Sequence, residues 1–243
     1  CALPILEEHR ADLDLVLPGW LTVSGRDLAV TESPTIEADL VRLRATGPPW
    51  GWMPVLTAGG SEADLVVGLA DAVARDRLER CLVRTAQRLG AAGVVLDLPV
   101  GLWRAAPVPG HLGGRQRRLG PPPPPPLELL TGELARELHR EGLRQGVVIP
   151  LADPAVPLEA LGRAVDLVLA MAVLRAPAAP GPLAGQAWVE EGLKRLAAAL
   201  PPGRLLPVFG VQACDWEDGR PAPIPWRETM ARARRAGSAW AWD

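Results

Sequence analysis

The sequence predicts an α/β fold built around a parallel sheet. Short apolar segments alternate with stretches of helical spacing about six times along the 243 residues. Most of the apolar segments are continuous rather than alternating, which is typical of strands that are covered on both faces. Strands that alternate with helices in this way favour parallel pairing, and a chain of this length can bury a sizeable core.

Six continuous apolar segments are predicted as strands. They span residues 13–23, 52–58, 93–98, 146–152, 165–173 and 205–211. In parallel α/β folds, ligands bind where the carboxyl ends of the strands meet. Candidate functional residues should therefore lie at the ends of these segments.

Five segments between the strands are predicted as helices, over residues 35–46, 61–89, 127–143, 185–200 and 225–236. Ser33 and Pro34 mark the start of the first. In the second, leucines recur at helical spacing, and Ser61 with Asp64 resembles a capping box. The third has a leucine stripe, the fourth stops at the sequence Pro-Pro-Gly over 201–203, and the fifth is short, basic and amphipathic.

Composition excludes several classes of protein. The net charge of -2 argues against a dedicated nucleic-acid binder, and no apolar run approaches the ~18 residues of a membrane span. Three cysteines and three histidines lie far apart, so we expect neither a disulfide framework nor a metal site. There is no glycine-rich nucleotide motif and no tyrosine, and the sequence predicts no cofactor.

Several segments resemble family 18 glycoside hydrolases, the chitinase superfamily. AAGVVLDLP over 91–99 resembles the fourth-strand signature DGxDxDxE, and VDLVLAMAV over 165–173 resembles the sixth-strand signature, in which Met-x-Tyr-Asp follows an apolar run. Residues 180–216 resemble the loop, helix and strand that end in Gly-x-x-x-x-Asp-Trp. The opening LDLVLPGWLTV resembles the second strand of the branch in bacterial multidomain glycan synthases, beside a polysaccharide deacetylase and a family 2 glycosyltransferase.

The resemblance implies a (β/α)8 barrel formed by one domain over residues 1–243. A Pro/Arg-rich loop insertion is expected at about 104–126, and the start of a small insertion at about 217–243. The first and last strands of the barrel are not evident, so either neighbouring sequence completes the barrel or the domain has shrunk. Deacetylase and glycosyltransferase domains of a larger protein, and an extracytoplasmic location, are implied by the resemblance alone.

The catalytic motif departs from the family pattern. Its three aspartates fall on Ala92, Val95 and Asp97, and its glutamate, which the family uses as general acid, falls on Pro99. A prolyl ring cannot donate a proton to a leaving glycosidic oxygen. In the sixth-strand motif, Met171 is kept, but Val173 and Leu174 replace the tyrosine and the aspartate. We therefore predict no catalytic residue, and a domain that binds glycan or acts as a scaffold in the metabolism of N-acetylglucosamine polysaccharides.

A polysaccharide or oligosaccharide is the predicted partner. Exposed tryptophan faces stack on the apolar faces of sugar rings, although a tryptophan that packs into the core gives the same sequence signal. The predicted substrate-binding residues are Trp20, Asp97, Met171, Gln186, Asp215 and Trp216.

Two other functions stay open. An active glycosidase would use carboxylates outside the family motif, namely Asp153, Glu190, Glu191 or Asp215. A protein-interaction module would dock a partner on the proline run 121–126, which should form polyproline II.

Overall fold

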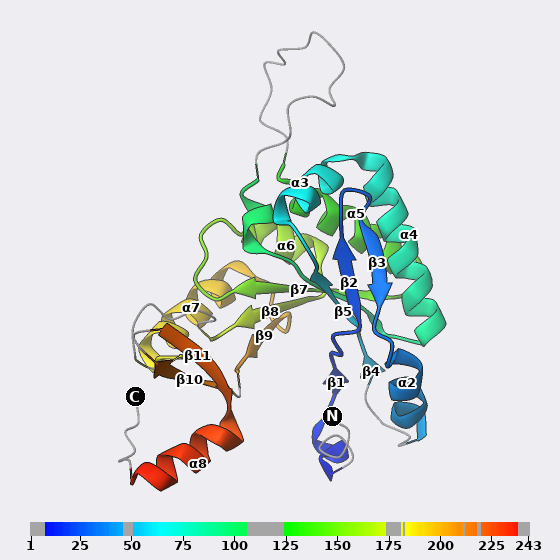
Figure 1. Cartoon of the computed structure of the whole chain (residues 1–243). Helices are drawn as coiled ribbons and strands as arrows, with labels where there is room; N and C mark the ends of the chain where they lie inside the picture. The colour runs from blue at the N-terminus through cyan, green and yellow to red at the C-terminus, as the bar shows by residue number, and fades with distance from the viewer. Residues whose placement is uncertain are drawn as a thin grey trace.

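The computed structural model describes residues 8–45, 51–105, 124–173, 181, 183–210, 212–217 and 220–237 (Figure 1). Leu174 and most of the expected insertion at 104–126 lie outside these residues, as does the C-terminal segment 238–243. The docking of a partner on the proline run therefore stays a prediction.

A seven-stranded sheet forms the centre of the molecule. Its order is β3-β2-β5-β6-β7-β8-β9, and all neighbours are parallel except β2 and β3, which form an antiparallel hairpin. The strands are β2 (Leu21–Ser24), β3 (Ala29–Glu32), β5 (Val55–Ala58), β6 (Gly93–Asp97), β7 (Arg144–Pro150), β8 (Leu167–Met171) and β9 (Leu205–Val208). The predicted α/β class with a parallel sheet is confirmed. In the described part of the chain, the order runs from β3 to β9 without closing on itself.

Two further strand pairs flank this sheet. β1 (Leu15–Val16) pairs in parallel with β4 (Gly51–Trp52), and β10 (Gln212–Glu217) pairs with β11 (Arg220–Pro225) as an antiparallel hairpin. The predicted strands 13–23 and 52–58 are each split in two. The interruptions contain Pro18 and Pro54, which have no N–H to give to a strand ladder.

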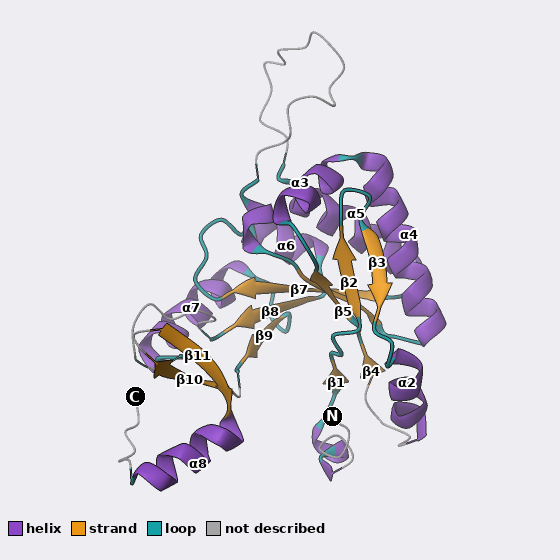
Figure 2. Cartoon of the chain, in the orientation of Figure 1, coloured by secondary structure: helices purple, strands orange, loops and turns teal. Residues whose placement is uncertain are grey.

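Helices connect the parallel strands, and Figure 2 shows them gathered mainly on one side of the sheet. They are α2 (Ile36–Ala45), α3 (Glu62–Ala70), α4 (Ala72–Leu89), α5 (Pro126–Arg140), α6 (Leu158–Ala164), α7 (Gln186–Ala199) and α8 (Trp226–Ala236), with short 3-10 helices η1 (Arg10–Asp12) and η2 (Val100–Trp103). None of the helices in the described residues is long and apolar enough to cross a membrane.

The predicted single helix over 61–89 is wrong. It breaks at Asp71, whose extended backbone (φ -82°, ψ 115°) ends α3 and whose Oδ1 accepts the Val73 N–H at 2.9 Å to cap α4. The predicted capping box is also wrong, because Ser61 makes no side-chain cap and Asp64 accepts from Arg26 Nε at 2.7 Å. Aspartate favours such a break because its short carboxylate binds nearby backbone N–H groups.

Most of the buried core lies between the sheet and the helices. Val94 and Leu96 of β6 face this layer and are almost fully buried. The opposite face of the sheet carries a smaller cluster of three buried side chains, Met53, Val95 and Leu169. Burying each large apolar side chain contributes roughly 1.5–3 kcal/mol relative to leaving it exposed, so the helix-covered face is the main source of stability.

Candidate functional site

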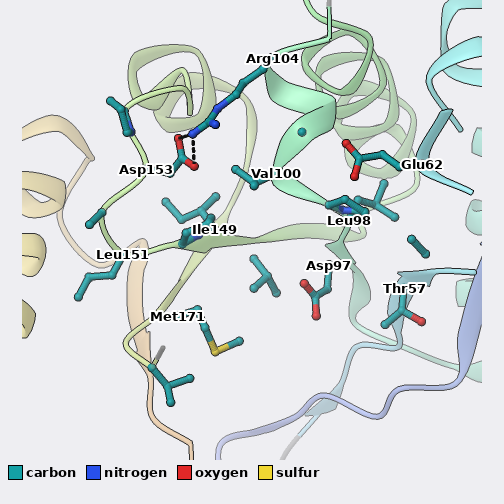
Figure 3. A pocket seen from close by; sticks show the side chains of 18 of the residues that line it. Thr57, Glu62, Asp97, Leu98, Val100, Arg104, Ile149, Leu151, Asp153 and Met171 are labelled. Atoms are coloured by element: carbon teal, nitrogen blue, oxygen red, sulfur yellow. Dashed lines mark hydrogen bonds and ion pairs between the residues drawn. The ribbon is translucent and has the colours of Figure 1, made fainter. Parts of the chain in front are cut away.

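A cavity of about 830 Å³ lies at the carboxyl ends of four parallel strands. Thr57 of β5, Asp97 of β6, Pro150 of β7 and Met171 of β8 all line it (Figure 3). Its volume falls in the usual range for small-molecule sites, about 300–1,000 Å³. The strand order thus brings together ends that are far apart in the sequence.

The lining is mainly apolar, with a few polar side chains. Its apolar part comes from the strand ends, from the loops that follow them, and from a half-buried tryptophan of α7: Ala58, Leu98, Pro99, Val100, Val148, Ile149, Leu151, Ala152, Pro154, Val173 and Trp188. The polar side chains are Thr57, Glu62, Asp97, Arg104 and Asp153. Such a surface suits a ligand with both apolar faces and hydrogen-bonding groups.

Asp97 occupies the last position of β6, opposite Thr57 in the parallel ladder with β5. Figure 3 shows its carboxylate pointing into the cavity between Met171 and Thr57. The Thr57 hydroxyl donates to the Leu21 carbonyl at 3.2 Å, which fixes its orientation at the end of β5. Of the predicted binding residues, the structure brings Asp97 and Met171 to this one site.

Pro99 also lies on the cavity wall, directly before η2. Val95, two residues before Asp97, is fully buried against Met53 and Leu169. Val173 follows β8 and lines the cavity with 8% of its surface exposed. The side chains at these three positions cannot transfer a proton or accept a hydrogen bond from a ligand.

Arg104 and Asp153 form an ion pair at the cavity. Arg104 Nη2 lies 2.8 Å from Oδ1 and 2.7 Å from Oδ2 of Asp153, and the Ala155 N–H donates to Oδ1 at 2.8 Å. Burial by itself would raise the pKa of Asp153, but these hydrogen bonds and the charges of Arg104 and Arg195 lower it below its ordinary value. Asp153 is therefore ionised at neutral pH and cannot act as a proton donor.

Glu62 is a cavity residue that the sequence patterns did not indicate as functional. It lies in the first turn of α3, and its carboxylate faces the backbone of Gly101 in η2. A Cβ at Gly101 would lie 1.8 Å from Glu62 Oε1, so the absence of a side chain there allows this close approach. The only signal in the sequence is that α3 begins soon after a strand end.

Two of the predicted binding residues lie elsewhere in the main body of the molecule. Trp20 is only 6% exposed, and its Nε1 donates to Asp39 Oδ2 at 3.3 Å. Gln186 is exposed at the start of α7, where its Nε2 donates to Glu190 Oε1 at 2.9 Å. Neither residue lines the cavity.

Asp215 and Trp216 lie in the β10–β11 hairpin and also do not line the cavity. Asp215 accepts the Trp216 N–H at 2.9 Å and forms an ion pair with Arg232 of α8. Both residues are half-buried within this hairpin and helix. The hairpin was not predicted, because its strands contain three prolines at alternate positions of β11.

The carboxylates proposed for an alternative hydrolase are also dispersed. Glu190 and Glu191 are exposed on α7 and do not line the cavity. Hydrogen bonds from Gln186 and Lys194 lower the pKa of Glu190 below its ordinary value. Asp153 alone of the four alternatives lines the cavity. Among the described residues, no cluster of three or more histidine, cysteine or acidic side chains could hold a metal ion.

No family model and no curated protein matches the sequence. Solved structures do match. A chitinase from Chromobacterium violaceum has a TM-score of 0.80 at 22% identity, with 99% of this chain and 74% of that chain covered. The spore cortex-lytic enzyme SleL from Bacillus cereus has a TM-score of 0.76 at 15% identity, covering 100% of this chain and 56% of that one.

A family 18 chitinase from Cycas revoluta has a TM-score of 0.68 at 17% identity, covering 99% of this chain and 78% of that chain. The likeness in all three cases extends over nearly the whole chain, while the identities are low. The chain therefore has the fold of the chitinase-like family 18 glycoside hydrolases, the family that its strand-end motifs resemble.

Proposed function

We propose that this chain is a catalytically degenerate family 18-like domain that binds an N-acetylglucosamine-type glycan in the cavity without cleaving it. The observation that carries this proposal is Pro99. It lies on the cavity wall at the position where the resembled family has its proton donor. Loss of a positioned general acid typically costs ~10²–10⁴ in rate.

Asp153, Val95 and Val173 do not replace that donor. Asp153 is held ionised by Arg104, so it has no proton to give. Val95 and Val173 stand where the family has polar groups that orient the substrate acetamido group, and apolar side chains cannot do so. A bound glycan would thus lack the proton donor of the family motif and the alignment of its own nucleophile.

Binding a glycan without cleaving it does not require a proton donor. The half-buried Trp188 offers an aromatic surface for the apolar face of a sugar ring. The carboxylates of Asp97 and Glu62 can accept hydrogen bonds from sugar hydroxyl or amide groups. In this proposal, residues 1–243 form one such domain, and deacetylase or glycosyltransferase domains of a larger protein are its partners.

Calorimetry with a soluble N-acetylglucosamine oligomer, combined with an assay for newly formed reducing ends at high protein concentration, tests this proposal. We expect saturable binding with no cleavage. Turnover that Asp97→Ala abolishes would overturn it. Absence of binding to any N-acetylglucosamine oligomer, acetylated or partly deacetylated, would contradict the glycan assignment.

One observation favours an active hydrolase as a second candidate. Three carboxylates line the cavity, those of Glu62, Asp97 and Asp153, and glycoside hydrolysis commonly uses two carboxyl groups in opposite protonation states. Because Asp153 is ionised, Glu62 or Asp97 would have to supply the proton. Turnover that is lost in Glu62→Gln as well as in Asp97→Asn would support this second candidate.

A further inference from the structure

An ionic cluster of two buried side chains and one that is 30% exposed, that of Glu133, lies between α4 and α5. Arg75 and Glu79 are four residues apart on α4, so they share one face of that helix, and Glu133 faces them from α5. Arg75 is 6% exposed and Glu79 is 7% exposed. Charged side chains are rarely buried this deeply unless each one has a partner.

The hydrogen bonds of Arg75 go to partners other than Glu79. Its Nε donates to Glu133 Oε2 at 2.7 Å and its Nη2 to Glu133 Oε1 at 3.3 Å. Its Nη1 donates to the Leu69 carbonyl in the last turn of α3 at 2.7 Å. Arg75 therefore ties three helices together, while Glu79 Oε1 is buried without a hydrogen-bond partner in the described structure.

The cluster thus holds two carboxyl groups and one guanidinium. With both carboxyls ionised, it would bury an uncompensated negative charge, which is strongly unfavourable. A proton on Glu79 removes that charge and provides an O–H that can donate to Glu133. We propose that Glu79 and Glu133 share a proton in the folded protein, and that the packing of α3, α4 and α5 against one another weakens when this proton leaves.

The surroundings of Glu79 support this arrangement. Its burial, the charge of Glu133 and the hydrogen bond that protonated Glu79 can make to Glu133 raise the pKa of Glu79 to about 7, against the opposing effect of Arg75. Glu137 of α5 adds a further negative charge that acts in the same direction.

Among the described residues, Arg75 is the cation that acts on Glu79. Glu137 pairs with Arg140 on α5. Glu32 of β3, which packs against α4, faces Arg88 near the other end of α4. From α3, the contact to the cluster is the Leu69 carbonyl.

The sign of the pH effect follows from the raised pKa. The folded state binds the proton more tightly than the unfolded state. The stabilisation is therefore fully present below the ordinary glutamate value of 4.5, and it is lost as the pH rises through about 7. Between pH 5 and pH 8, this group alone should lower the folding equilibrium constant by roughly tenfold or more.

Two of these three helices pack against the wall of the cavity. α3 and α5 both pack against η2, and η2 supplies Val100 and Gly101 to the cavity lining. α3 also carries Glu62. Weakening of this packing would therefore begin in the elements that support one side of the cavity, whatever ligand the cavity takes.

Urea unfolding of the whole chain at pH 5 and pH 8 tests the proposal. Glu79→Gln keeps the shape of the protonated side chain but cannot ionise, so its folding constant should fall at least tenfold less between the two pH values than that of the wild type. The control is Glu159→Gln, because Glu159 is 86% exposed in a surface pair and its loss should leave the wild-type difference unchanged. An equal pH dependence in Glu79→Gln and the wild type would overturn the proposal.

A second measurement does not depend on how well the variant folds. Infrared spectroscopy of the wild type should detect a buried protonated carboxyl group at pH 6, and its signal should disappear as the pH passes through about 7. A folded wild-type protein without any such signal at pH 6 would overturn the proposal independently.

Discussion

Arg104 holds Asp153 at the cavity through one nitrogen, with Nη2 at 2.8 and 2.7 Å from the two carboxylate oxygens. The two residues are 49 positions apart in the sequence, on the segment after η2 and the loop after β7. The Asp153 side chain is 12% exposed, whereas that of Arg104 is 58% exposed. The pair therefore combines a buried carboxylate with a cation that still faces solvent.

Arg104→Gln should raise the pKa of Asp153. Burial, which raises the pKa, would remain, while the hydrogen bond and charge that lower it would be lost. In the wild type, the lowered pKa contributes stability that is present above the ordinary aspartate value and is lost as the pH falls through the lowered value. The variant should thus be less stable than the wild type at neutral pH, and it should lose less stability during acid titration.

An NMR titration of the Asp153 carboxyl, together with acid unfolding, measures this effect. The control is Arg26→Gln, which removes an arginine from the exposed pair with Asp64 and should leave the Asp153 titration unchanged. An Asp153 titration curve that is the same in Arg104→Gln and the wild type would contradict the prediction.

Trp188→Ala should weaken glycan binding by about 2- to 13-fold, because one aromatic contact typically contributes ~0.5–1.5 kcal/mol. The half-buried Trp188 lines the cavity. Trp216 is also half-buried but lies in the β10–β11 hairpin, so Trp216→Ala is the matched variant. Calorimetry should separate the two. A loss of glycan affinity in Trp216→Ala alone would indicate that the glycan binds at the hairpin and not in the cavity.

Pro99→Glu should not produce hydrolysis by itself. The backbone at Pro99 (φ -54°, ψ 137°) is open to glutamate, so the variant should fold. A carboxylic acid would then stand at the cavity wall, but Val95 and Val173 would still leave the substrate acetamido group without polar partners. Release of reducing ends that appears in Pro99→Glu and not in Pro99→Gln would show that a single donor restores the reaction.

Gly192→Ala should destabilise the fold by about 1–3 kcal/mol. A Cβ at Gly192 on α7 would lie 2.4 Å from Cγ of Leu151, and Leu151 is only 1% exposed, so it has little room to move. Gly132→Ala on α5 is the opposite case, because nothing lies within 4 Å of the new Cβ. That variant should stabilise the protein by up to about 1 kcal/mol, since alanine favours a helix interior. The midpoints of denaturant unfolding at one pH compare the two variants. Similar shifts of the midpoint in Gly192→Ala and Gly132→Ala would contradict the packing argument.

Local patterns were sufficient for the fold class and for the position of the site within it. Continuous apolar segments followed by amphipathic ones indicated parallel strands and helices, and the structure has them in a seven-stranded sheet. Asp97, Pro99 and Met171 were placed at strand ends from the sequence, and all three line the cavity. This succeeded because side-chain periodicity reports which face of an element is buried, and parallel strands all end at one edge.

Such local patterns could not predict contacts between segments that are distant in the sequence. Trp20 lies near the end of the predicted apolar segment 13–23 and was expected to bind a ligand, yet it is buried and bonded to Asp39. Nothing near Arg104 in the sequence indicates Asp153 as its partner, and nothing near Glu79 indicates Glu133. Whether a carboxylate is ionised depends on burial and on charges brought close by strand order and helix packing, and these exist only once the chain has folded.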